Sequence, residues 1–403
     1  MKVRTMQAVD KNKPSAEWIA NIRRRLPCEP EVDRVLTAKL ERRSGPGYSP
    51  VPLETLVEGS RKLIAASIGD DFEISDANWL SGGASKLQMF FNLTWNAPGE
   101  GRTKTRMVLR MEPAESISET SRLSEFHAIK MLEGYIPVPP TYWVDGDGSY
   151  LPYPAIIYGF AEGVAKSTKS TSNVTGVGTY MPPEIRAPLG AQFVEHYAKL
   201  HAFDVAGADL GPIDRPSSNA EAVLWQLNHW ERIWEEDGNE DIPLMRLAMA
   251  WMRKNPPECD RLSLIHGDFR TGNFLFTEDD NRITTWLDWE FAHLGDRHED
   301  LSWTMKPVFG QYAEDGKTLL IGGLMPAPEF IARYEALSGL SIDQKKLDYY
   351  DILNSYKSIA ICLGTGTRIA TNGKTHQDVL TAWLAGVSYM LLDELRTQLE
   401  GVL

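Results

Sequence analysis

Residues 1 to about 70 carry apolar side chains at helical spacing. Pro27 and Pro30 interrupt the pattern, and a Gly/Pro/Ser-rich stretch separates it from a last helix that should end at Gly69. The predicted helices cover residues 16–26, 32–40 and 53–68. The chain is therefore predicted to open with a helical extension.

From residue 72 the apolar positions change to the alternating spacing of β-strands. Three strands are expected first, then one helix, then two more strands. The strands are predicted at residues 72–80, 87–96, 105–111, 141–144 and 155–160, and the helix at residues 121–132. This order predicts a small mixed sheet with one helix packed on it.

A Ser/Thr/Gly-rich stretch at residues 164–180 predicts a mobile loop, after which helical spacing dominates. Two short strands interrupt the helices. Helices are predicted at residues 187–203, 219–234, 243–254, 328–337, 347–361 and 377–399, with a further one starting at residue 300, and the strands at 274–277 and 283–287. The chain is expected to divide into residues 1–60, 61–160 and 161–403.

Composition excludes several classes of protein. The net charge of −13 over 403 residues argues against a general nucleic-acid binder. Three widely separated cysteines suggest neither a disulfide framework nor a metal site. We expect no membrane partner and a cytoplasmic location, because no apolar run is long enough to span a bilayer and the N-terminus does not resemble a signal peptide.

Asp268 and Asn273 are the first candidate catalytic pair. They lie five residues apart on a predicted short loop, in the segment HGDFRTGN. Phosphoryl transfer from a nucleotide needs a carboxylate that orients the acceptor hydroxyl and takes its proton, and an Asn or Asp that holds Mg²⁺. The alternative is an Asx-rich turn in which both side chains cap the backbone.

Asp288 and Glu290 follow a predicted strand in the segment WLDWE. A carboxylate at a strand end can project into a cleft toward Mg²⁺ and phosphate oxygens. Glu290 is a candidate for a second metal or its waters, with a structural role as the alternative. The succession of Asp268, Asn273 and Asp288 favours phosphoryl transfer over simple turn capping.

Two further features suit a nucleotide phosphate chain. Two glycines in the segment Ser81-Gly82-Gly83-Ala84-Ser85 allow backbone N–H groups to approach phosphates, although an ordinary hairpin turn has the same composition. Arg110 on the third predicted strand and Glu125 on the following helix offer a cation for the phosphates and a carboxylate to hold it. The alternative is a surface ion pair.

Together these segments resemble the aminoglycoside phosphotransferase/choline kinase-like family. The matching segments are Leu80-Ser81-Gly82-Gly83, Leu109-Arg110, His266 to Arg270 with Asn273, and Leu287 to Glu290. The resemblance implies a bilobed α+β fold of the protein-kinase type, with a small N-lobe of antiparallel sheet plus one helix and a larger, mostly helical C-lobe. Residues 61–160 would be the nucleotide-binding N-lobe and residues 161–403 the C-lobe.

The resemblance also assigns roles. Asp268 and Arg270 would be catalytic, and Asn273, Asp288 and Glu290 would hold Mg²⁺. Ser81, Gly82, Gly83, Ser85, Arg110 and Glu125 would hold the phosphates of ATP or GTP, and Tyr158 and Phe160 fall where the hinge between the lobes should bind adenine.

The sequence is most similar to a subgroup of kinase-like domains associated with acyl-CoA dehydrogenases, through Leu287 to Glu290 and Leu294-Gly295-Asp296. Lys86 departs from the Asn usual there, and Arg297 to Glu299 replace a Pro-bearing stretch. The expected reaction is Mg²⁺-dependent transfer of the ATP γ-phosphate to a small-molecule hydroxyl, on a hydroxyacyl-CoA or hydroxy acid. An aminoglycoside, macrolide or amino alcohol is the alternative acceptor, and a catalytically silent nucleotide-binding protein is the alternative function.

Overall fold

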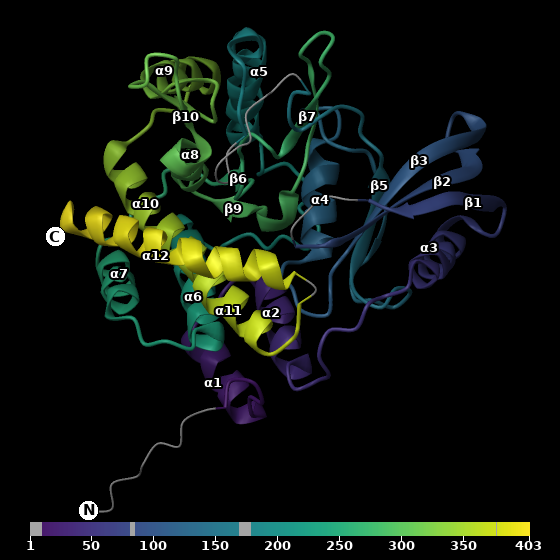
Figure 1. The fold of residues 1–403 in the computed structure, drawn as a ribbon, viewed down its shortest axis with the longest axis horizontal. Helices are drawn as coiled ribbons and strands as arrows, with labels where there is room; N and C mark the ends of the chain where they lie inside the picture. Colours follow the sequence, from purple (N-terminus) through teal and green to yellow (C-terminus); the bar gives the residue numbers. More distant parts are fainter. Residues whose placement is uncertain (1–9, 81–84, 169–178, 376) are drawn as a thin grey trace, which may run out of the picture.

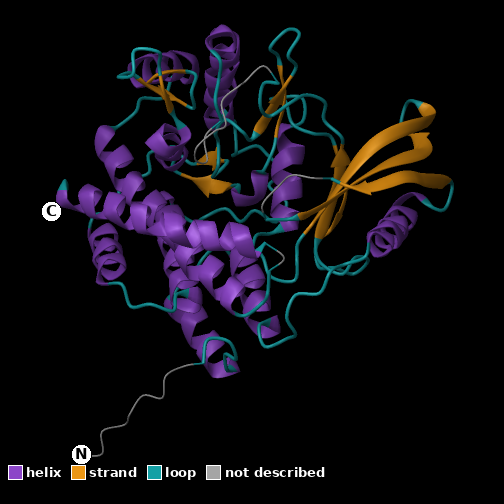
Figure 2. Ribbon diagram, in the orientation of Figure 1, coloured by secondary structure: helices purple, strands orange, loops and turns teal. Residues whose placement is uncertain are grey.

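A small β-rich lobe projects from one side of a larger helical lobe (Figures 1 and 2). The computed structural model describes residues 10–80, 85–168, 179–375 and 377–403. The predicted α+β, bilobed architecture is confirmed by this arrangement.

The small lobe is built on a five-stranded sheet with the order β1-β2-β3-β5-β4. All of its ladders are antiparallel, which confirms the antiparallel sheet implied by the family resemblance. The mixed sheet inferred from the strand order alone was wrong. The reason is that β4 and β5 form their own hairpin, which places β5 rather than β4 beside β3. The bounds are β1 Phe72–Trp79, β2 Leu87–Ala97, β3 Gly101–Met111, β4 Thr141–Asp145 and β5 Ala155–Gly159.

A helix covers each face of the sheet, because successive side chains of a strand point to opposite faces. On β3, Leu109 packs in the cluster that includes Leu63 of helix α3 (Leu53–Ile68), whereas Val108 packs in the cluster that includes Phe126 of helix α4 (Arg122–Leu132). Helix α3 has the predicted bounds and ends before Gly69. Arg110 shares the face of Val108 and therefore points toward α4 and the cleft between the lobes.

The first two helices, α1 (Ala16–Arg25) and α2 (Pro30–Arg42), pack on the large lobe. Leu36 lies in the same apolar cluster as Leu227 of helix α6 (Asn219–Asp237). Buried Lys39 pairs with Asp237, with Nζ 3.2 Å from Oδ2. The division at residue 60 stays a prediction, although that position falls inside α3.

The large lobe contains most of the helices. They are α5 Pro183–Ala202, α6, α7 Pro243–Lys254, α8 His298–Met305, α9 Ala327–Ser338, α10 Gln344–Ile359, α11 Thr367–Thr371 and α12 Asp378–Glu400. The π-helical segment Ala360–Gly366 joins α10 to α11. The two predicted strands are present as β7 Phe274–Phe276 and β8 Ile283–Trp286.

Other short strands of this lobe were not predicted. They are β6 Ser263–Ile265, which pairs with β9 His293–Gly295, and β10 Gln311–Tyr312, β11 Leu319–Ile321 and β12 Met325–Pro326, which form a separate small sheet. Segments of two or three residues are too short to show the alternation that identifies a strand.

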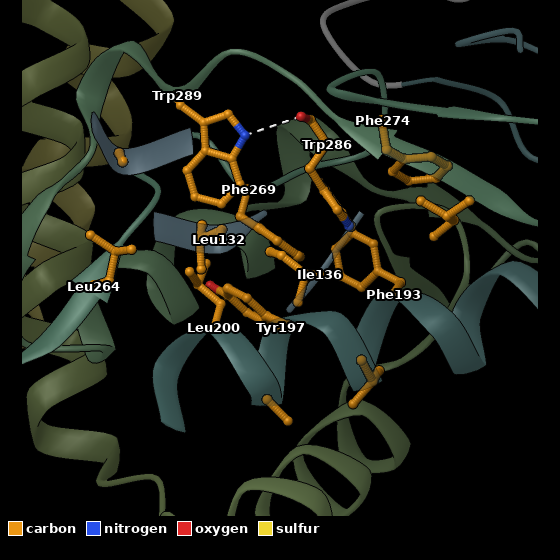
Figure 3. Close-up of a cluster of buried hydrophobic side chains, with 14 of the residues drawn as sticks. Leu132, Ile136, Phe193, Tyr197, Leu200, Leu264, Phe269, Phe274, Trp286 and Trp289 are labelled. Carbon is orange, nitrogen blue, oxygen red and sulfur yellow. Dashed lines mark hydrogen bonds between the residues drawn. The ribbon is translucent and has the colours of Figure 1, made fainter. Parts of the chain in front are cut away.

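Aromatic side chains form the core behind the loop that follows β6 (Figure 3). Phe269 stacks on Trp286, with ring centres 3.7 Å apart, and on Tyr197 of α5, at 4.1 Å. Trp289 donates a hydrogen bond from Nε1 to the carbonyl oxygen of Trp286 at 3.0 Å. This packing fixes the loop on the same core that carries β8.

Within the described ranges, no helix combines the length and the apolar character needed to cross a membrane.

Candidate active site

The loop between β6 and β7 carries the predicted catalytic residues, and hydrogen bonds hold the backbone of its first residues. The backbone N–H groups of His266 and Gly267 each donate to the carboxylate of Asp300, at 2.7 Å. Gly267 has φ +81°, and a Cβ there would lie 2.4 Å from Cβ of Phe291. Glycine is therefore required by both backbone conformation and space.

His266 connects this loop to the predicted metal-binding segment. Its Nδ1 accepts from the backbone N–H of Asp268 at 3.2 Å, so Nε2 carries the proton and donates to the carbonyl oxygen of Leu287 at 3.0 Å. Burial lowers the pKa of His266, which favours the neutral ring that these two bonds need. His266 thus holds the loop in place through its two ring nitrogens.

The Asp268 carboxylate is held by three donors. Oδ1 accepts from Nε of Arg270 at 2.8 Å and from Nε1 of Trp303 at 2.6 Å, and Oδ2 accepts from Nδ2 of Asn273 at 2.7 Å. A carboxylate oxygen accepts about two hydrogen bonds. Oδ2 therefore keeps one acceptor position for a substrate hydroxyl.

Asn273 is oriented by its contacts with Asp268. Its amide nitrogen donates to both the carbonyl oxygen and Oδ2 of Asp268, at 2.9 and 2.7 Å. Because the nitrogen is used in this way, the amide oxygen, the atom that binds metals, is the one left for a ligand.

Asp288 follows β8 in the left-handed region, with φ +67°. Asp tolerates this conformation better than most residues, and such positions often occur at functional sites. Its side chain is 30% exposed in the cleft, and Oδ1 accepts a hydrogen bond from Arg110. Asp288 thus joins the cleft face of the sheet to the large lobe.

Arg110 and Glu125 pair across β3 and α4, with Nη1 3.3 Å from Oε1. Ser121 caps α4 by accepting from the backbone N–H of Ser124 at 3.1 Å. Arg122, in the first turn, is fully buried and contacts the other oxygen of Glu125. Glu125 itself lies behind Arg110, out of the cleft, where it can position the guanidinium.

Glu290 lines the cleft, and its carboxylate is held by residues of the small lobe. Its Oε2 is 2.9 Å from Nζ of Lys86 and 3.7 Å from Nη2 of Arg110, and its Oε1 accepts from Ser85 Oγ at 3.2 Å. Burial alone would raise its pKa, but Lys86 and Arg110 lower the pKa of Glu290 to about 2. Both oxygens contact residues of the small lobe, which favours the structural role given as the alternative for Glu290. Its role as a metal ligand stays a prediction.

Lys86 is buried, and it joins Glu290 to the segment that follows β3. It donates to Glu112 at 2.8 Å, to Ser116 Oγ at 2.9 Å and to the carbonyl oxygen of Ser118 at 2.8 Å. The departure noted in the sequence is therefore an ion-paired residue between the lobes.

The two lobes enclose a cleft of about 670 Å³. Nine of the predicted site residues line it: Ser85, Arg110, Tyr158, Phe160, Asp268, Arg270, Asn273, Asp288 and Glu290. The predicted phosphate-loop residues Ser81, Gly82 and Gly83 lie outside the described residues. A volume of this size suits a nucleotide-sized ligand.

The hinge end of the cleft is aromatic and buried. Tyr158 on β5 is in the core cluster of the α4 face, and burial raises its pKa to about 12. Phe160 packs edge-on against Phe90 with ring centres 5.6 Å apart, and the guanidinium of Arg106 lies 3.8 Å from its ring centre. An apolar wall of this kind suits a planar base.

Asp288 and Asn273 fit a Mg²⁺ site in their donor chemistry. Hard oxygen donors from one carboxylate and one amide are typical when substrate phosphates and water complete the coordination shell. No group of three or more His, Cys, Asp or Glu side chains arranged for a metal occurs among the residues that the structure describes. A site of this type does not need one, because its remaining ligands come with the nucleotide.

Sequence reasoning missed several residues that contact the site: Lys86 as an ion-pair partner, Glu112, Arg122, Trp303 and Lys357. The one available signal was the unusual Lys86; the others are brought to the site by tertiary packing.

Residues 80–337, more than half of the chain, match the model of the family described as APH, phosphotransferase enzyme family. The chain belongs to this family. It is accordingly a phosphotransferase, and the predicted reaction class is confirmed at this level.

Sequence relatives of this APH-family chain include acyl-CoA dehydrogenase family proteins. This agrees with the predicted similarity to kinase-like domains associated with acyl-CoA dehydrogenases. Acyl-CoA dehydrogenase family member 11 of Gallus gallus is 28% identical over 183 residues, which are 43% of this chain and 23% of that protein. The protein named probable acyl-CoA dehydrogenase IBR3 of Arabidopsis thaliana is 24% identical over 290 residues, 67% of this chain and 34% of its own. The matched regions thus span about a quarter to a third of these relatives.

Solved structures of the same fold include a candidate aminoglycoside phosphotransferase from Ralstonia eutropha. It is 20% identical, with a TM-score of 0.62, and the match covers 87% of this chain and 98% of that one. Choline kinase LicA from Streptococcus pneumoniae is 13% identical, with a TM-score of 0.52 and coverage of 84% and 98%. At these identities the similarity establishes the kinase-like fold.

Proposed function

We propose that this phosphotransferase moves the γ-phosphate of ATP to a hydroxyl group of a small molecule with the help of Mg²⁺. The observation that carries the proposal is the Asp268 carboxylate, which has one acceptor position left and shares a cleft with Arg110, Asn273 and Asp288. The residues that we propose as base, phosphate clamp and metal donors therefore line one cleft. The fold neighbour LicA has been solved with AMP, which supports a nucleotide in this cleft.

In this mechanism Asp268 Oδ2 accepts the hydrogen bond of the acceptor hydroxyl and takes its proton as the new O–P bond forms. The bond between the γ-phosphorus and the β-bridging oxygen breaks, and ADP leaves. Asn273 and Asp288 would hold Mg²⁺, which neutralises charge on the phosphate oxygens. Arg110, backed by Glu125, would hold the phosphates, and positioning provides most of the catalysis because the transition state is loose.

The charge of the cleft bears on the acceptor. Its lining contains the cations Lys86, Arg110 and Arg270 and the carboxylates Asp268, Asp288 and Glu290. A cleft that binds a polycationic acceptor is expected to carry a ring of carboxylates. Arg270 beside the base instead favours an acceptor that carries negative charge. Together with the acyl-CoA dehydrogenase relatives, this supports a hydroxyacyl-CoA or a hydroxy acid.

The test is Mg²⁺-dependent ADP release across a panel of hydroxyacyl-CoAs, hydroxy acids, aminoglycosides, macrolides and amino alcohols. We expect turnover with the acyl acceptors, and a loss of about 10²–10⁴-fold in Asp268→Asn, which keeps the shape of the side chain but removes the base. Turnover confined to cationic acceptors would overturn the acceptor class. ATP binding without ADP release from any acceptor would contradict the proposed reaction.

A further inference from the structure

A buried lysine lies directly beneath the catalytic loop. Lys357, near the end of α10, is 2% exposed, and its Nζ donates to the carbonyl oxygen of Gly267 at 2.8 Å. The two residues are 90 positions apart in the sequence. A side chain from the C-terminal helices thus supports the peptide unit that leads into Asp268.

Three aromatic rings surround the ammonium group of Lys357. Nζ lies 4.5 Å from the ring centre of Phe291, 4.9 Å from that of Trp303 and 5.3 Å from that of Trp230. A cation held over aromatic faces and away from water is stabilised by the negative electrostatic potential of the rings. The cage therefore favours the charged amine and fixes it in one place.

Trp303 connects this cage to the reacting carboxylate. Its ring faces Lys357, and its Nε1 donates to Asp268 Oδ1 at 2.6 Å. Lys357 therefore contacts both the carbonyl oxygen just before Asp268 and the ring that orients the Asp268 side chain. Lys357 acts on the Asp268 carboxylate only through these two groups. It therefore does not itself touch the substrate.

The surroundings of Lys357 carry an excess of negative charge. Burial lowers the pKa of Lys357, and nearby carboxylates oppose that shift. Burial also keeps the pKa of His229 well below its usual value, so that ring adds no charge. The charged or titratable groups that face the amine are Glu299 and Asp300 of α8, Asp268 of the catalytic loop, Glu290 and His229.

We propose that Lys357 is a positioning residue for phosphoryl transfer, whose ammonium group holds the Gly267 carbonyl and the Trp303 ring so that Asp268 Oδ2 faces the acceptor hydroxyl. This inference rests on the proposed function, because it assigns to Lys357 the orientation of the base used there. Orientation of the base affects the transition state rather than ground-state binding of nucleotide.

The first test is Lys357→Met, which keeps the length of the side chain and removes the charge. We expect kcat to fall about 100-fold, as for a small displacement of a catalytic group, while KM for the nucleotide stays within about twofold. Lys374→Met is the matched control, since Lys374 is also buried and also donates from Nζ to backbone carbonyl oxygens, but to those of Gly45 and Pro46 instead of the catalytic loop. It should leave kcat at the wild-type level in the folded fraction.

The second test is the pH profile of Lys357→Arg. In the wild type, kcat should fall as pH rises through the lowered pKa of Lys357, because the amine loses its proton. Arginine stays protonated, so Lys357→Arg should not show this fall. Identical alkaline limbs in the two proteins would overturn the inference, even if Lys357→Met does not fold. Wild-type kcat in a folded Lys357→Met protein would also overturn it, whereas a wild-type protein without turnover would refute the proposed function instead.

Discussion

At the scale of single residues, the site depends on positions where a side chain and the backbone are constrained together. Gly267 is the clearest case. Its N–H donates to Asp300, its carbonyl accepts from Lys357, and its α-carbon packs against Phe291. A change at this position disturbs the catalytic loop on three sides at once.

We expect Gly267→Ala to lower the free energy of unfolding by about 2–4 kcal/mol, because positive φ and a close contact act together. Turnover should fall with it, since the peptide unit before Asp268 must move. Gly316→Ala is the control, because Gly316 also has positive φ (+66°) but a Cβ there would meet nothing within 4 Å. Chemical denaturation of both variants measures the difference, and equal losses would show that the Phe291 contact is relieved at no cost.

The sequence predicted those site residues whose placement follows from local pattern. Arg110 faces the cleft because β3 alternates, and Asn273 and Asp288 adjoin short predicted strands. Asp268 lies on the predicted loop that leads into the first of these strands. Glu290 was different, since its role depends on Lys86, which lies more than 200 positions earlier. Lys357 and Trp303 reach the loop through helix packing, which no local pattern records.

At the scale of elements, helix α2 connects the two lobes. Toward the small lobe, Nη2 of Arg42 lies 2.6 Å from Glu119, and Glu31 accepts from Ser121, the cap of α4, at 2.5 Å. Toward the large lobe, Lys39 and Arg43 pair with Asp237 of α6. The predicted helical extension thus braces α4, the helix that carries Glu125.

Arg42→Ala should lower turnover several-fold and stability by about 1–3 kcal/mol, because it leaves the buried Glu119 carboxylate without its partner. The segment from Glu112 to Glu119 also holds Lys86, which lines the cleft. If this segment loses its contact with Arg42, the disturbance would therefore reach the cleft. Arg24→Ala is the control, because Arg24 is exposed on α1, where it bonds to Asn21. Steady-state kinetics and thermal unfolding of both variants test the brace; an Arg42→Ala protein that behaves like Arg24→Ala would contradict it.

At the scale of the whole molecule, Glu29 makes global stability depend on pH. It precedes α2 at the junction with the large lobe, and burial raises its pKa from 4.5 to about 7. Between these values the folded chain holds a proton that the unfolded chain has lost. The free energy of unfolding should therefore fall as pH rises from about 4.5 to 7, by at most about 3 kcal/mol from this group.

Glu29→Gln, neutral at every pH, should remove this loss. It should match the wild type near pH 4.5 and be more stable at pH 8, while its side-chain oxygen can still accept from the backbone N–H of Asp214. Glu41→Gln, on the exposed part of α2, serves as the control. Urea denaturation at several pH values gives the comparison, and parallel curves for wild type and Glu29→Gln would show that Glu29 ionises normally.

The family match covers residues 80–337, yet α2 lies before that range and Lys357 after it. Segments on both sides of the matched range therefore reach the site, one to brace α4 and the other to support the loop of Asp268. For anyone who dissects this protein or grafts its catalytic region into another, we expect the smallest active unit to extend beyond residues 80–337 on both sides. A fragment cut at the family limits would retain the reacting groups while losing the scaffolding that aligns them.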